Sequence, residues 1–86
     1  MADTHGRWLH LGGVAGVARE LRQRDVLRDV MRHPDRSITI EAHRSKFAVV
    51  YGTARSDLEQ LVNEGYLLRR KVGRRFTYRA GERIKR

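Results

Sequence analysis

The sequence predicts a mainly helical α+β domain, in which three helices are followed by a two-stranded β-hairpin. Two patterns indicate this order: apolar residues recur at helical spacing between residues 14 and 63, and the spacing becomes strand-like after Gly65. The chain has 86 residues, which leaves room for one domain with a small core. It contains no cysteine, so the sequence predicts neither disulfides nor thiolate metal sites.

The first helix is predicted over residues 14–32. Helix-forming residues dominate this segment, and His33-Pro34 ends it because the residue before a proline is pushed out of helical geometry. The apolar stripe shifts partway along: it consists first of Val14, Val17 and Leu21 and then of Leu27, Val30 and Met31. Either the helix bends near residues 23–25, or one long helix contacts two partners.

Residues 1–13 are expected to form a flexible leader, because their three glycines weaken regular structure. The leader nevertheless carries the apolar residues Trp8, Leu9 and Leu11. These side chains either dock on the domain or belong to an interface, which makes a homodimer through residues 8–31 a candidate.

The second helix is predicted over residues 40–47, after a short extended segment at residues 37–40. Thr39 is placed to cap it by accepting a hydrogen bond from a free backbone N–H group. Its inward residues are expected to be Phe47 and either Ala42 or His43.

The third helix has the strongest periodicity, over residues 51–63, and follows a turn at residues 48–50. One of its faces is apolar and consists of Ala54, Leu58, Leu61 and Val62. Gly65 suits the left-handed residue that commonly ends a helix. Val50 stands where helix-turn-helix turns often place Ser or Thr, so the sequence leaves the capping of this helix open.

Residues 66–80 are predicted to form the hairpin. A two-residue loop at Gly73-Arg74 would place Leu67, Arg69 and Lys71 on the same face as Phe76, Tyr78 and Ala80. A three-residue loop would instead match Leu68 and Val72 with Phe76 and Tyr78. Because a shift of one residue turns every side chain to the other face, both registers stay open.

The order helix, short strand, helix, turn, helix and hairpin is that of a winged helix-turn-helix. This fold has a three-helix core and a C-terminal two-stranded wing. The predicted domain covers residues 14–80, between the leader of residues 1–13 and a basic tail of residues 81–86.

Positive charge is concentrated at the C-terminal end of the chain. Residues 66–86 carry nine basic residues against one acidic residue, Glu82, whereas residues 1–65 are nearly balanced, with ten against nine. A local field of one sign suggests an anionic partner, although a solubilising basic tail is the simpler alternative.

Double-stranded DNA is the predicted partner. In a helix-turn-helix the second helix lies in the major groove, so the small and polar outer face of the third predicted helix is a candidate reader of bases. Glu59 on that face argues against contact, because it would repel phosphate. The Arg-rich hairpin suits a phosphate backbone or a narrow minor groove, while Phe76 and Tyr78 are expected to belong to the core rather than to stack on bases. The expected contact residues are Thr53, Arg55, Ser56, Gln60, Arg69, Arg70, Lys71, Arg74 and Arg75.

The sequence offers no candidate for catalysis, for a cofactor or for a metal. The four histidines have no familiar ligand spacing, and no glycine loop has the lysine that phosphate-binding loops require. Arg55 and Asp57 are expected to bridge neighbouring elements rather than to form a catalytic pair. Apolar runs are too short to span a membrane, and a cytoplasmic location is expected.

Four runs of residues form a recognisable pattern: Arg36-Ser37-Ile38-Thr39-Ile40-Glu41, Val49-Val50-Tyr51-Gly52-Thr53-Ala54-Arg55-Ser56-Asp57-Leu58, Leu61-Val62-Asn63-Glu64-Gly65-Tyr66-Leu67 and Val72-Gly73-Arg74-Arg75-Phe76. With these runs the chain resembles, over about residues 25–79, the C-terminal winged helix of many Fic (filamentation induced by cAMP) proteins. Looser forms of these elements occur across bacterial winged-helix repressors. The AMP-transferring loop of the Fic family, His-Pro-Phe-x-Asp/Glu-Gly-Asn-Gly-Arg, has no counterpart here, so the resemblance implies a regulatory or binding module without catalytic residues.

The sequence therefore predicts a DNA-binding winged helix, either the regulatory region of a Fic-type protein or a small transcriptional regulator. The alternative is a protein-interaction or dimerisation module that positions a Fic catalytic domain without binding DNA. The basic hairpin favours the first prediction, and the apolar leader with the shifting stripe of the first helix favours the second.

Overall fold

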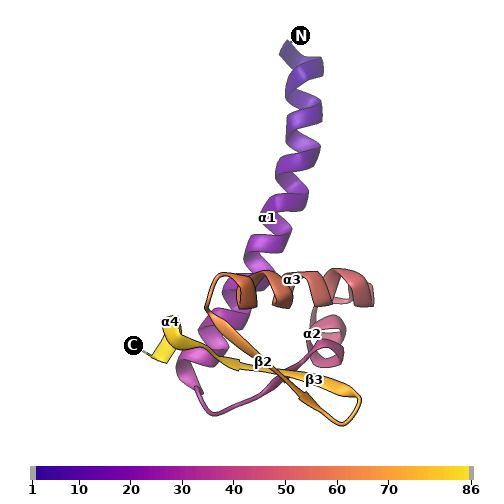
Figure 1. The fold of residues 1–86 in the computed structure, drawn as a ribbon. Helices are drawn as coiled ribbons and strands as arrows, with labels where there is room; N and C mark the ends of the chain where they lie inside the picture. The colour runs from indigo at the N-terminus through magenta and orange to yellow at the C-terminus, as the bar shows by residue number, and fades with distance from the viewer. Residues whose placement is uncertain (1, 86) are drawn as a thin grey trace.

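The computed structural model describes the backbone of residues 2–85 and the side chains of residues 14–84 (Figure 1). Its elements are α1 (Ala2–Arg32), β1 (Ile38–Thr39), α2 (Ile40–Phe47), α3 (Tyr51–Asn63), β2 (Leu67–Val72), β3 (Arg75–Ala80) and α4 (Glu82–Lys85). The three strands form one antiparallel sheet in the order β1-β3-β2. The protein is thus α+β as predicted, and the arrangement is compatible with a winged helix.

α1 is longer than the sequence predicts, and of the two alternatives left open it is one continuous helix. It begins at Ala2, within the predicted leader, and no break interrupts it at residues 23–25. Glycine lowers helix propensity but keeps its backbone hydrogen bonds, and the first proline of the chain is Pro34. The N-terminal part of α1 stands away from the other elements (Figure 1), which makes the molecule elongated, at 50 × 29 × 19 Å. The side chains of Trp8, Leu9 and Leu11 lie outside the described residues.

Local capping sets the ends of α2 and the start of α3. The Thr39 side chain accepts a hydrogen bond from the Ala42 backbone N–H at 3.0 Å, as predicted. α2 ends at Phe47, and the following residue, Ala48, caps it in a left-handed conformation with φ of 53°. α3 begins after Val50, whose side chain makes no capping hydrogen bond. Of the two alternatives for the inward side of α2, His43 is buried and Ala42 is exposed, while Phe47, also expected to face inward, is half-buried. Ile40 at the start of α2 is buried as well.

The hairpin adopts the first of the two registers that the sequence leaves open. Leu67 pairs with Ala80, Arg69 with Tyr78 and Val72 with Arg75, so the loop is Gly73-Arg74. Gly73 has φ of 62° and Gly65 has φ of 85°, a region that side chains other than glycine rarely adopt. Two glycines therefore fix the start of the hairpin and its turn.

Two features at the edges of the domain differ from the prediction. β1 adds a third strand to the predicted two-stranded hairpin, with Ile38 opposite Tyr78 of β3. The predicted basic tail forms the short helix α4, in which the Arg83 guanidinium lies 4.2 Å from the centre of the Tyr66 ring. Both contacts join segments far apart in sequence, which local patterns do not reveal.

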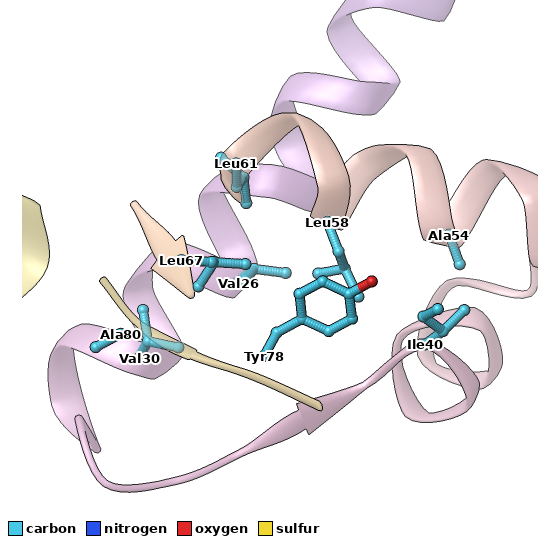
Figure 2. Close-up of a cluster of buried hydrophobic side chains, with 9 residues drawn as sticks. All are labelled: Val26, Val30, Ile40, Ala54, Leu58, Leu61, Leu67, Tyr78 and Ala80. Atoms are coloured by element: carbon cyan, nitrogen blue, oxygen red, sulfur yellow. The ribbon is translucent and has the colours of Figure 1, made fainter. Parts of the chain in front are cut away.

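The core lies between α1, α3 and the sheet (Figure 2). Tyr78 of β3 is fully buried, and its ring lies among side chains from the helices and from β2. The predicted apolar face of α3 is confirmed for three residues, since Ala54, Leu58 and Leu61 are buried and Val62 is half-buried. The remaining core residues are Val26, Val30, Ile40, Leu67 and Ala80.

Candidate nucleic-acid interface

The two faces of the hairpin carry different residues because of its register. The face toward the core begins with the buried pair Leu67 and Ala80 and ends, near the turn, with Lys71 opposite Phe76. Side chains alternate across a strand, so the outer face carries the other set: Leu68, Arg70, Val72, Arg75, Thr77 and Arg79. Cations therefore lie on both faces of one short ribbon.

Most of these cations have no acidic partner. Among the described side chains, Arg69 is the one hairpin cation with an ion pair, to Glu59 of α3 at 2.7 Å. The hairpin itself contains no acid. No ion pair within the described part of the chain involves Arg70, Lys71, Arg74, Arg75 or Arg79. The concentration of charge seen in the sequence is therefore not neutralised by folding.

Glu59 fastens the hairpin to α3. Its carboxylate accepts hydrogen bonds from the Tyr78 hydroxyl at 2.6 Å and from Arg69 at 2.7 Å. Burial alone would raise the pKa of Glu59, but these two hydrogen bonds and the charges of Arg69 and Arg55 outweigh it and hold the pKa below its ordinary value. Burial, followed by the hydrogen bond to Glu59, raises the pKa of Tyr78. The sequence suggests that the negative charge of Glu59 would repel phosphate. In the structure this charge is instead paired within the protein.

The outer N-terminal part of α3 is open beside the hairpin. Gly52, Arg55 and Ser56 are exposed, and Thr53 is half-buried. A Cβ atom added at Gly52 would meet nothing within 4 Å, so the space beside this residue is open. The Arg55 guanidinium lies 5.7 Å from the centre of the Phe76 ring, within cation–π range. Arg55 thereby bridges α3 and the hairpin, as the sequence predicts.

Gln60 is a predicted DNA-contact residue whose side chain is bonded to α1 in the structure. Its side-chain oxygen accepts a hydrogen bond from the amide of Gln23 in α1 at 3.0 Å, and its own amide lies 3.5 Å from Glu64. These contacts hold Gln60 on the side of α3 that faces α1. The helical period predicted a polar position correctly, but it could not show that a neighbouring helix occupies that side.

A shallow groove of about 340 Å³ joins the hairpin turn to the N-terminal ends of α2 and α3. Tyr51 is exposed at its edge. Glu41 is the acid in this groove, and it is paired with Arg44 at 3.0 Å. The residues that line the groove are Thr39, Ile40, Glu41, Tyr51, Arg74, Arg75 and Phe76.

A buried ionic cluster lies on the opposite side of α3. Asp57 is fully buried and accepts hydrogen bonds from Arg22 at 2.6 and 3.1 Å and from His43 Nε2 at 3.0 Å. Gln23 also donates to the Asp57 backbone carbonyl at 3.1 Å. The hydrogen bond to Asp57 raises the pKa of Arg22 in spite of partial burial. The cluster joins α1, α2 and α3.

The bridging role predicted for Asp57 is therefore confirmed, but its partners were missed. The sequence prediction treated His43 as one of four isolated histidines. The available signal was that His43 sits on the inward face of its helix, where a buried imidazole needs a hydrogen-bonding partner. The identity of that partner depends on how α2 packs against α3.

Comparisons of the chain with family models, with curated proteins and with solved structures give no match. Within the described residues, no three His, Asp or Glu side chains lie together in a way that could hold a metal ion. None of the described helices is both long enough and apolar enough to cross a lipid bilayer.

Proposed function

We propose that this protein is a winged-helix module that binds double-stranded DNA through the N-terminal part of α3 and the β2–β3 hairpin. The observation that carries the proposal is the set of five hairpin cations without acidic partners, on a ribbon held firmly against α3. Duplex DNA presents phosphates at regular spacing, and such cations bind it with release of condensed counterions.

The two parts of the interface have different tasks in this proposal. Arg70, Lys71, Arg74 and Arg75 contact phosphates and set the position of the protein on the duplex. Arg55 and Ser56 lie on the exposed part of α3 and read base edges in the major groove. Thr53 contributes at the margin because it is half-buried. Arg69 contributes mainly by holding the hairpin, because Glu59 occupies its guanidinium.

Fluorescence anisotropy with random-sequence duplexes at several salt concentrations tests the phosphate contacts. We expect wild-type affinity to fall with a log–log slope of about −0.9 per phosphate contact. The double variant R74A/R75A should flatten the slope by about one to two contacts and weaken binding to all sequences alike. The control R32A/R36A removes two exposed cations away from the hairpin, one at the end of α1 and one in the segment before β1, and should leave the slope unchanged. Absence of wild-type binding near 50 mM salt would refute the proposal.

Selection from a pool of duplexes tests the reading of bases by α3. Arg55→Ala or Ser56→Ala should change which sequences are enriched. Gln60→Ala should not, because Gln60 is bonded to Gln23 on the α1 side. If Gln60→Ala changes the sequence preference and the other two variants do not, α3 is oriented differently on the duplex.

We place this module in a regulator, either a small bacterial repressor or the C-terminal region of a Fic-type protein. The support for the Fic context is the motif resemblance over about residues 25–79, without the AMP-transferring loop. The chain alone is then no enzyme: incubation with labelled ATP and Mg²⁺ should label neither the chain nor a test protein. Reproducible labelling by a pure sample would overturn this assignment.

The second candidate is a protein-interaction module that binds no DNA, whose partner would be a Fic catalytic domain. It is favoured by the exposed apolar residues Val14, Val17 and Leu21 on α1. Binding of such a domain that persists in R74A/R75A, together with no binding to any duplex by the wild type, would favour it over the first proposal.

A further inference from the structure

Arg55 of α3 lies against the hairpin through an aromatic ring and not through a carboxylate. Its guanidinium lies 5.7 Å from the centre of the Phe76 ring in β3. Among the described residues, no hydrogen bond or ion pair involves the Arg55 side chain. The contact with Phe76 is therefore the one that restrains this exposed arginine in the described structure.

Glu59 is the acid that would ordinarily pair with Arg55. It lies four residues further along α3, a spacing at which opposite charges meet on one helix face. One of its carboxylate oxygens, however, accepts a hydrogen bond from Arg69 at 2.7 Å, and the other accepts one from the Tyr78 hydroxyl at 2.6 Å. Because the hairpin engages both oxygens, the N–H donors of Arg55 remain available to a ligand.

The position of the Phe76 ring is set by the same group of contacts. Phe76 is half-buried at the margin of the core, whereas Tyr78, two residues further along β3, is fully buried. The Arg69 guanidinium lies 5.0 Å from the centre of the Phe76 ring and is paired with Glu59. The ring is thus held between the core and a fixed cation, and it presents a defined surface to Arg55.

We propose that Phe76 is a positioning residue, which holds the Arg55 guanidinium where it donates two hydrogen bonds to a guanine of the bound duplex. This inference rests on the proposed DNA binding and deepens it by naming the base. A guanidinium has five N–H donors and no acceptor, so two such bonds require a base with two neighbouring acceptors. In the major groove, guanine presents that pair as N7 and O6, whereas adenine and cytosine each present a donor.

Restraint by a ring suits this task better than an ion pair does. A carboxylate would occupy the N–H donors of Arg55, whereas a ring attracts the cation without an oxygen that competes with the base. An unrestrained arginine samples many rotamers, and fixing it on binding costs conformational entropy. Phe76 lowers that cost for the base contact of Arg55 and leaves the phosphate contacts of the hairpin unchanged. Its loss should therefore affect sequence preference more than general affinity.

Selection of duplexes by the wild type and by Arg55→Ala identifies the base that Arg55 contacts. We expect one position at which the wild type selects guanine and the variant does not. Replacing that guanine with 7-deazaguanine removes the N7 acceptor and should weaken wild-type binding about fivefold in fluorescence anisotropy, with no effect on Arg55→Ala. Loss of preference for a base other than guanine, or equal weakening of both proteins, overturns the assignment.

Phe76→Leu tests the ring, because it keeps an apolar side chain at the margin of the core. We expect the preference for guanine at this position to fall about two- to fivefold, the range of an exposed cation–π contact. The salt slope on random-sequence duplexes should not change. Phe76→Tyr keeps the ring and should retain the preference. The matched control is Phe47→Leu, which removes another half-buried ring with a cation, Lys46, at 5.7 Å, and should also retain it.

The double variant R55A/F76L separates positioning from a purely structural role. If Phe76 acts through Arg55, the double variant has the same base preference as R55A alone. A ring that only packs the hairpin would instead lower the affinity for all duplexes alike, in both backgrounds. That result, or an unchanged preference in Phe76→Leu, overturns this inference while wild-type binding leaves the proposed function standing. Absence of wild-type binding to any duplex near 50 mM salt overturns both.

Discussion

The buried cluster around Asp57 and the β2–β3 hairpin use arginine in opposite ways. In the cluster, Arg22 is nearly buried and both of its bonded nitrogens meet one carboxylate. In the hairpin, Arg70, Arg74 and Arg75 are exposed and have no ion pair within the described residues. The first arrangement holds helices together, whereas the second leaves the charge available to an anionic partner.

This difference shows that the pairing of charges, more than their number, distinguishes a structural surface from a binding surface. α3 contributes to both regions through residues only two positions apart. Asp57 faces the α1 and α2 side, and Glu59 faces the hairpin, where it neutralises Arg69 alone. Substitutions along α3 and in the hairpin should therefore separate stability from binding.

The largest effect is expected for Asp57→Ala. It leaves Arg22 and His43 without their acceptor in the interior, and removal of one partner of a buried ion pair costs about 3–5 kcal/mol. Urea denaturation followed by circular dichroism measures the loss. The control is Asp29→Ala, which breaks the exposed pair with Arg36 and should cost about 1 kcal/mol or less. Similar losses for both variants would show that the cluster is not structural.

Leu58→Ala measures how much the apolar core beside the cluster contributes to the free energy of unfolding. Leu58 is fully buried, so its truncation should cost about 2–5 kcal/mol in the same urea denaturation. Leu68→Ala, at an exposed position of β2, should change the free energy of unfolding by less than about 0.5 kcal/mol. A negligible loss for Leu58→Ala would mean that α3 packs through another face.

Glu59→Gln weakens the hydrogen bonds between α3 and the hairpin. We expect it to lower the free energy of unfolding by about 1–2 kcal/mol at neutral pH. The pKa of Glu59 is lowered on folding, so its contribution is full above its ordinary value of 4.5 and is lost as the pH falls through the folded value. The difference between wild type and variant should therefore shrink below about pH 4.5. Glu41→Gln, at an exposed ion pair, is the control. A difference that persists at pH 2 would contradict the assignment.

The smallest effect on stability is expected for R74A/R75A. Neither side chain contributes to the core or to an ion pair in the described structure, so the urea midpoint should stay within experimental error. The same variant should show the largest change in the salt dependence of DNA binding. A clear loss of stability would mean that the two arginines have a structural role and would remove the contrast with the cluster.

Local signals in the sequence located most of the secondary structure. Thr39 caps α2, the period of α3 gives its inward residues, and Gly65 and Gly73 adopt the positive φ values that the two turns require. Each of these features depends on hydrogen bonds or sterics within a few residues, so it can be inferred without the fold. The hairpin register was limited to two alternatives for the same reason.

Contacts between segments far apart in the chain were decided by the tertiary structure alone. The pairing of β1 with β3, the bonds of His43 and Arg22 to Asp57, and the contact of Gln60 with α1 depend on how whole elements pack. A polar residue on an amphipathic helix is equally compatible with solvent, a phosphate or a neighbouring helix. The sequence by itself determined where the charge of this protein is concentrated, and the packing of the helices determined which of those charges remain unpaired.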